Sequence, residues 1–106
     1  MRETEYIRWF TGEDRSRQVI RTEGGIVTGF VVQYEAKIGD RWHAIVRYDN
    51  AHGFVHRDVL WPDGRVAKRR LELGDLREAL VFAETDIARN WRRHRERFVG
   101  RMGERQ

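Results

Sequence analysis

The chain has 106 residues, of which 40% are hydrophobic and 36% charged, and its formal net charge is +4. This length suits one domain, and four Trp, three Tyr and five Phe can fill an interior, which argues against global disorder. The lack of cysteine excludes disulfides and thiolate metal sites. Neither the apolar core of a signal peptide nor an apolar run of membrane-spanning length occurs, so we expect a cytoplasmic protein that makes no membrane contact.

The first sixteen residues are mostly charged and end near a Thr-Gly-Glu-Asp stretch. We expect them to form a short strand or helix laid over the core. After them, alternating apolar residues interrupted by turn residues predict an antiparallel meander of about four or five strands within residues 17–71. The predicted strands are 17–22, 26–38, 41–49, 54–61 and 65–71.

A long helix is predicted after the strands. Asp75, with Glu78 three residues later, is a capping-box variant. One apolar stripe recurs at three- and four-residue spacing, formed by Leu76, Leu80, Ala83, Ile87, Trp91, His94 and Phe98. The pattern predicts a helix over 75–98, roughly 36 Å long at its standard rise, that covers one face of the sheet and projects at its Arg-rich end. Residues 99–106 are expected to be a flexible tail.

Together these elements predict a single α+β domain over residues 1–106, in which one face of the meander is packed by the C-terminal helix. Positive charge is concentrated at the end of that helix. Residues 89–106 hold seven Arg and two Glu, a net +5, whereas residues 1–88 sum to −1. Such a concentration favours a polyanionic partner such as RNA or DNA, and a merely solvated charged face is the alternative.

The turn between the two longest predicted strands decides which side chains share a face, because a slip of one residue exchanges the faces. A two-residue turn at 39–40 mixes apolar and polar residues, whereas a three-residue loop at 39–41 pairs apolar residues with one another. We therefore expect the second version. Continued through a four-residue loop at 50–53, it places Trp61 opposite Trp42 on the helix-covered face.

The opposite face then carries polar side chains, namely Gln33, Glu35, Lys37, His43, Arg47, Asp49, His56, Asp58, Lys68 and Arg70. In this pairing His56 lies between Arg47 and Arg70. Asp58 lies between Ile45 and Lys68. A solvated face with cross-strand ion pairs is the plain alternative to a reaction site.

Two neighbouring histidines make general acid–base catalysis the functional interpretation of this face. Imidazole titrates near neutral pH, so His52 and His56 can take and return a proton. Metal-independent RNA cleavage needs such a pair together with fixed cations against the developing phosphate charge. The candidate catalytic residues are His52, His56, Arg47, Asp49 and Asp58. The candidate substrate-binding residues are Arg57, Lys68, Arg70, Arg89 and Arg93.

Two alternatives remain open for these residues. Each histidine taken singly can have a hydrogen-bonded structural role, and we expect His94, on the helix stripe, at the edge of the core. Asp49, His52, His56 and Asp58 also offer imidazole and carboxylate ligands to a divalent ion. Their spacing matches no established zinc motif, so we expect neither a metal nor a cofactor.

The segment from about Phe30 to Asp86 resembles the TumE-like toxin family of prokaryotic toxin–antitoxin operons. The resemblance lies in Arg47-Tyr48-Asp49-Asn50, followed by His52 and His56 and by a helix from Asp75 onward. More of the chain is similar to small uncharacterised bacterial and archaeal proteins with a Tyr-Asp-x-Ala-His-Gly-x-x-His-Arg-Asp stretch. The resemblance to the toxins implies a growth-inhibiting protein that acts on RNA and is neutralised by a DNA-binding antitoxin.

The sequence therefore leads to two functional hypotheses. The first is a toxin-like, metal-independent ribonuclease with a cognate antitoxin as partner. The alternative is a non-catalytic RNA- or protein-binding domain whose contacts lie on residues 89–97 of the basic helix. A homodimer is left open in both.

Overall fold

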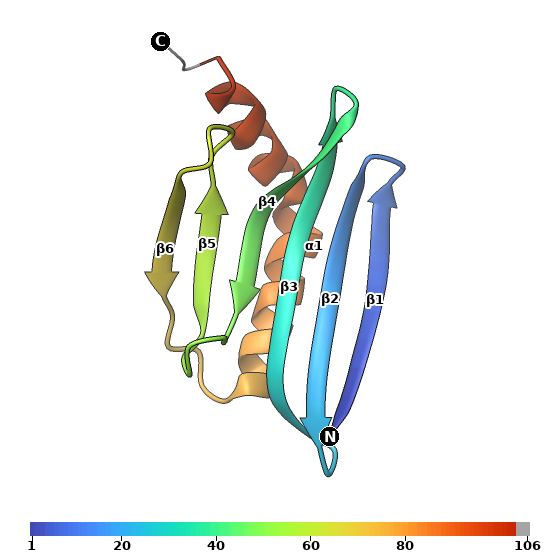
Figure 1. The fold of residues 1–106 in the computed structure, drawn as a ribbon, viewed down its shortest axis with the longest axis vertical. Helices are drawn as coiled ribbons and strands as arrows, with labels where there is room; N and C mark the ends of the chain where they lie inside the picture. Colours follow the sequence, from blue (N-terminus) through green and yellow to red (C-terminus); the bar gives the residue numbers. More distant parts are fainter. Residues whose placement is uncertain (104–106) are drawn as a thin grey trace.

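The computed structural model describes residues 1–103 and consists of one antiparallel sheet with one helix packed on it, an α+β fold (Figure 1). The sheet is a meander in which six strands lie side by side in chain order. The strands are β1 (Arg2–Thr11), β2 (Asp14–Glu23), β3 (Ile26–Ile38), β4 (Arg41–Asp49), β5 (His56–Leu60) and β6 (Val66–Arg70). The helix α1 (Leu76–Arg101) lies behind the sheet in Figure 1 and crosses it obliquely, so that its end lies near the turn between β5 and β6.

The first sixteen residues extend the sheet and do not lie over the core. Residues 2–11 form the edge strand β1, and the sheet therefore has six strands instead of four or five. The turn between β1 and β2 is closed by a 2.6 Å hydrogen bond from the Thr11 hydroxyl to Asp14. Because β1 is exposed along nearly its whole length, it needs no apolar alternation, and the usual sequence signal of a strand is missing.

The helix confirms the predicted capping box and apolar stripe. Asp75 accepts from the Glu78 backbone N–H, and Glu78 accepts from the Asp75 backbone N–H. Every residue predicted for the stripe is buried except Leu76, which is partly buried. The core lies between this stripe and the apolar residues of β3 and β4, chiefly Phe30, Val32, Tyr34, Ala36, Val46 and Tyr48.

Two expectations about the helix end were wrong. The helix continues to Arg101 instead of ending at 98, and the end does not stand free, since Phe98 is only 2% exposed and packs on the ring of His43 at 5.3 Å. The part of the expected tail over 104–106 lies outside the described residues. No helix within residues 1–103 is long and apolar enough to cross a membrane.

Both pairings considered for the β3–β4 hairpin occur, one on each side of a β-bulge. Near the turn, Ile38 pairs with Arg41 across the two-residue turn at 39–40, whereas further along Tyr34 pairs with Val46. The register shifts between these points because β4 carries one extra residue, Ile45, which is fully buried. The extra residue interrupts the alternation of side chains along β4. Residues between the turn and the bulge therefore point to the opposite face from the one they would have in an unbroken strand.

The bulge corrects the predicted faces of two residues. Trp42 lies on the face away from the helix, where its ring is 5.8 Å from that of Trp9, while Trp61 lies against Arg101 of α1. The two tryptophans are therefore on opposite sides of the sheet and do not pair. His43 faces the helix instead of joining the polar face, as its contact with Phe98 shows.

The loop between β4 and β5 has six residues, 50–55, instead of four. Asn50 holds its start, since its side chain accepts from the Phe30 backbone N–H at 3.0 Å and donates to the Thr28 carbonyl at 3.3 Å. The register of β5 against β4 shifts by two residues as a result, so each side chain keeps its predicted face but changes its neighbour. His56 lies opposite Asp49 instead of Arg47, and Asp58 lies opposite Arg47 instead of Ile45.

Candidate functional site

The candidate catalytic residues of β4 and β5 gather on the face away from the helix. The His56 Nε2 lies 3.0 Å from Asp49 Oδ1 and 4.0 Å from Asp58 Oδ1. The Arg47 Nε donates to the other Asp49 oxygen at 2.8 Å. Antiparallel pairing brings these residues together, because Asp49 and His56 are directly opposite, as are Arg47 and Asp58.

His56 is sealed within this cluster and not open to solvent. Its residue is 1% exposed, and the rings of His52 and Phe54 each lie 5.8 Å away and cover it from the loop. Arg70 in turn lies over the Phe54 ring at 4.6 Å. With Nε2 engaged by Asp49, the remaining Nδ1 is buried and has no hydrogen-bond partner among residues 1–103. The geometry thus favours a structural role for His56, which ties the loop to the sheet.

Asp49 is held as the anion in this pair. Burial by itself would raise the pKa of this carboxyl, but the Arg47 side chain, the Ala51 backbone N–H and His56 together lower it below its usual range. A carboxylate accepts, so the Nε2 of His56 is the donor in the pair. His52 stacks on the His56 ring with an interplanar angle of 23° and makes no hydrogen bond to it, so the His56 ring does not link Asp49 to the exposed His52 by direct hydrogen bonds.

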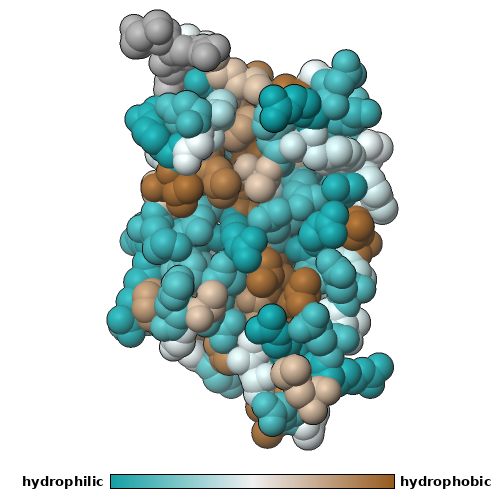
Figure 2. Space-filling view, viewed as in Figure 1, coloured by the Kyte–Doolittle hydropathy of each residue, from teal (hydrophilic) through white to brown (hydrophobic). Residues whose placement is uncertain are grey.

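Most of the remaining charge on this face is neutralised by neighbours. Asp58 pairs with Lys68 at 2.9 Å, as its predicted position opposite Lys68 implied. Glu35 pairs with Arg15 at 2.7 Å and with Arg17 at 3.3 Å. Figure 2 shows this face, which is largely hydrophilic with separate hydrophobic patches. No three His, Asp or Glu side chains within residues 1–103 converge as metal ligands.

The structure divides the candidate substrate-binding residues between two places. Lys68 and Arg70 lie beside Asp58 and His56 on the face away from the helix. Arg57 lies on the helix side, opposite Tyr48. Arg89 and Arg93 are exposed on α1 itself. One small ligand near His56 therefore cannot contact all five.

A second aspartate–histidine pair, which the sequence analysis missed, lies beneath the helix. The Asp86 Oδ2 accepts from the Tyr48 hydroxyl at 2.8 Å and lies 3.1 Å from His94 Nε2, while Asn90 donates to Oδ1 at 2.8 Å. Burial raises the pKa of Asp86, but these three hydrogen bonds outweigh it and lower the pKa to about 2. His94 is 6% exposed, so its predicted place at the edge of the core is confirmed.

The helix also presents four arginines at four-residue spacing: Arg89, Arg93, Arg97 and Arg101. We call these residues the arginine row. Because four residues exceed one turn by a small angle, the row starts on the solvent side at the exposed Arg89 and Arg93 and ends at the half-buried Arg97 and Arg101 beside the sheet. Its length is about 18 Å at the standard helical rise. Arg89 and Arg93 were predicted as substrate-binding residues and Arg97 lies within the predicted contact range 89–97, while the same spacing of four residues leads on to Arg101.

The arginine row lacks acidic partners. None of its members takes part in an ion pair among residues 1–103. Arg57 and Arg69, which are paired across β5 and β6, add two further cations on the helix side of the sheet, also without ion pairs in this part of the chain. The nearby Asp86 is occupied by its three hydrogen bonds. Like charges at four-residue spacing destabilise a helix, so this arrangement requires another explanation than stability.

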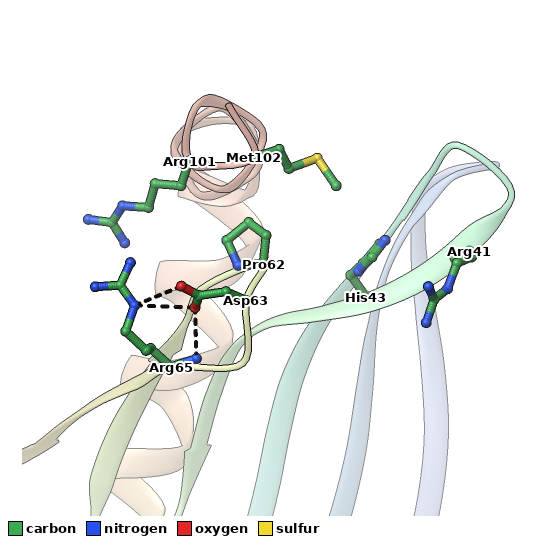
Figure 3. A pocket seen from close by; sticks show the side chains of 7 residues that line it. All are labelled: Arg41, His43, Pro62, Asp63, Arg65, Arg101 and Met102. Carbon is green, nitrogen blue, oxygen red and sulfur yellow. Dashed lines mark hydrogen bonds and ion pairs between the residues drawn. The ribbon is translucent and has the colours of Figure 1, made fainter. Parts of the chain in front are cut away.

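A cavity of about 330 Å³ lies where the row ends, between the β5–β6 turn and the tip of the β3–β4 hairpin (Figure 3). It is lined by Arg41, His43, Pro62, Asp63, Arg65, Arg101 and Met102. In Figure 3 the side chains of Arg65 and Arg101 extend to the same side of the turn. Arg65 is held by Asp63 at 2.9 Å.

A model of a domain of unknown function, DUF7718, matches residues 1–104. No curated protein and no solved structure matches the chain.

Proposed function

The chain belongs to the DUF7718 family of domains of unknown function, and from that premise we propose that this member binds single-stranded RNA along the arginine row. The observation that carries the proposal is the row itself, four guanidinium groups in line and without acidic partners within residues 1–103. Guanidinium groups bind phosphate through paired hydrogen bonds, and each contact releases condensed counterions from the nucleic acid.

An exposed aromatic side chain beside the row supports a single-stranded ligand. Phe82 is 44% exposed, and its ring contacts Tyr48 at 6.1 Å. It stands seven residues before Arg89, close to two helical turns, and therefore on the same side of α1. Proteins that bind single strands combine cations for the backbone with aromatic rings on which bases stack.

The test is fluorescence anisotropy with a 3′-labelled RNA oligonucleotide of twelve nucleotides across a series of KCl concentrations. The double variant Arg89→Gln/Arg93→Gln should bind more weakly. It should also show a slope of log K against log salt that is shallower by about 1.4, since each lost phosphate contact on a single strand contributes about 0.7.

The matched control is Arg2→Gln/Arg77→Gln, which removes the same charge from exposed arginines outside the row. This control should keep at least most of the affinity and the wild-type slope. Equal losses of RNA affinity in both double variants would show that binding depends on net charge and not on the arginine row. An affinity that salt does not change would also contradict the proposal.

A toxin-like ribonuclease is the second candidate, favoured by one observation. His52 is exposed and stacks on the sealed His56, and Arg70, which is paired with His56 across β5 and β6, lies over the Phe54 ring. In this version His52 takes the proton of the 2′-hydroxyl as that oxygen bonds to phosphorus, and returns it to the 5′-oxygen as the P–O5′ bond breaks. Lys68 and Arg70 face the phosphate, and the Asp49–His56 pair positions the loop. A cognate antitoxin would cover this face.

The two candidates separate on one substitution. His52→Ala should abolish RNA cleavage and growth inhibition in the ribonuclease version, while RNA affinity measured by anisotropy stays at the wild-type value. His56→Ala is a poor test alone, since it removes a buried hydrogen-bonded ring and lowers thermal stability. Full cleavage by purified His52→Ala protein would remove acid–base chemistry at this loop.

A further inference from the structure

The strongest unexplained feature of the molecule is a pair of arginines, Arg97 and Arg101, whose buried N–H groups lack partners within residues 1–103. The Nε and Nη2 atoms of Arg97 and the Nη1 atom of Arg101 are inaccessible to solvent and have no hydrogen-bond partner within residues 1–103. Arg57 of β5 is the third cation close to them. A buried charged donor without a partner carries a large desolvation cost, so native proteins seldom leave one unpaired.

The positive charges of these three arginines repel one another. Burial and the nearby cations Arg101 and Arg57 lower the pKa of Arg97, and Asp86 offsets them only in part. The oxygens of Asp86 are already taken by Tyr48, Asn90 and His94. Asp63, which lines the nearby cavity, is bound to Arg65.

We propose that Arg57, Arg97 and Arg101 form a binding site for a terminal phosphate group, that of a phosphate monoester or of inorganic phosphate. A monoester is close to a dianion at neutral pH and offers three oxygens, which suits three guanidinium groups better than the single charge of a phosphodiester. Arg101 connects this site to the 330 Å³ cavity, because it belongs to both and lies over the Trp61 ring at 3.8 Å. Figure 3 shows Arg101 among the side chains that line this cavity.

The same chemistry has two sources, the 5′-phosphate of an RNA strand or free inorganic phosphate. The assignment to RNA rests on the proposed function, since the cluster is the inner end of the arginine row. The assignment to free phosphate does not depend on it.

The first experiment is thermal unfolding in phosphate-free buffer, with inorganic phosphate added against KCl of equal ionic strength. Phosphate at ten times its dissociation constant should raise the wild-type Tm by about 5–10 °C beyond the KCl effect for a domain of this size. Arg97→Met should have a higher Tm than wild type without phosphate, because a buried unpaired cation is gone, and should lose the phosphate-dependent rise. Arg101→Met should lose the rise as well.

The control is Arg93→Met, which removes an exposed arginine one turn earlier in the same row. It should keep the phosphate-dependent rise. Absence of any rise beyond KCl in the wild type would overturn the proposal, and so would an equal loss in Arg93→Met and Arg97→Met.

The second experiment identifies the source by comparing 5′-phosphorylated and 5′-hydroxyl RNA of one sequence in the anisotropy assay. If the RNA end is the source, the phosphorylated strand should bind at least about tenfold tighter to wild type and equally to Arg97→Met, a difference of the size expected for charged hydrogen bonds. Equal binding of both strands together with the phosphate-dependent Tm rise assigns the site to free phosphate.

The outcomes also separate this inference from the proposed function. RNA binding that depends on Arg89 and Arg93, with no Tm rise and no preference for the 5′-phosphate, overturns the phosphate site alone. A Tm rise without any RNA binding overturns the RNA proposal alone and leaves a site for free phosphate.

Discussion

The two sides of this sheet treat their charges differently. At the β1–β3 side, cations are matched by acids in the pairs Arg15–Glu35, Arg17–Glu35, Arg17–Glu5 and Arg21–Glu3. On the helix side of β5 and β6, Arg57, Arg97 and Arg101 lie close together with no acid bound to them within residues 1–103. The formal charge of +4 describes neither side. A surface that can bind an anion differs from a solvated charged surface because its cations have no acidic partners. The number of cations alone does not show this difference.

The largest loss of stability should come from removing the buried acid at the start of β2. Asp14 is 4% exposed and accepts from Tyr34 at 2.6 Å and from Arg95 at 2.8 Å. Asp14→Ala leaves these two groups and the Thr11 hydroxyl without their acceptor, so the free energy of unfolding should fall by about 3–5 kcal/mol, as when one partner of a buried pair is removed. Urea denaturation measures it, with the exposed Glu13→Ala as control. A loss below about 1 kcal/mol would place Arg95 among the solvated surface charges.

A smaller effect is expected at Asp86, on the boundary between the two sides. Asp86→Asn weakens the hydrogen bonds of Tyr48, Asn90 and His94, and the free energy of unfolding should fall by about 1–3 kcal/mol at neutral pH.

The pH dependence of the same variant follows from the lowered pKa. Because the folded pKa of Asp86, about 2, lies below the usual value of 3.8, its stabilisation is present above the usual value and is lost as pH falls toward 2. The stability difference between wild type and Asp86→Asn should therefore shrink on acidification from pH 5 to pH 2, as followed by thermal unfolding. A constant difference over that interval would show that the carboxylate charge contributes nothing.

The smallest effects on stability are expected from single surface arginines, and their sign should differ between the two sides of the sheet. Arg93→Gln removes two like-charge contacts, with Arg89 and Arg97, and should raise the free energy of unfolding by about 0.4–1 kcal/mol. The same change at Arg17 removes its pairs with Glu5 and Glu35 and should lower it by up to about 1 kcal/mol. Chemical denaturation of the two variants side by side measures both. Destabilisation by Arg93→Gln would mean that the row has a structural counterion.

Local sequence patterns predicted the elements whose signal lies in a few neighbouring residues. The capping box at Asp75 and the helical period of the stripe located α1, and Gly39 and Gly64, both with positive φ, marked turns between strands. β1 was not predicted as part of the sheet because the sequence of an exposed edge strand need not alternate between apolar and polar residues. The sequence around Ile45 is a plain apolar run, Ala-Ile-Val, and nothing in it marks the residue that falls out of register.

The candidate site could be predicted only as far as neighbouring strands determine it. The shared face of Arg47, Asp49, His56 and Asp58 followed from alternation, and a shift of two residues preserved it. The burial of His56 depends on how the 50–55 loop folds back over it, which alternation does not encode. Counterions are likewise a tertiary property, so the spacing of the row is visible in the sequence while its lack of partners is not.

The surplus residue in β4 has an effect far from its own position. By turning Trp42 away from α1, it lets that ring meet Arg15 of β2 at 3.9 Å, across β3, and Trp9 of β1 at 5.8 Å, across β2 and β3. The edge strand β1, whose side chains are almost all exposed, is thereby held to the sheet by aromatic and cation–π contacts among Trp9, Arg15 and Trp42. Shortening the chain by Ile45 alone would swing Trp42 inward, and the margin of the sheet would come loose several ångströms from the deletion.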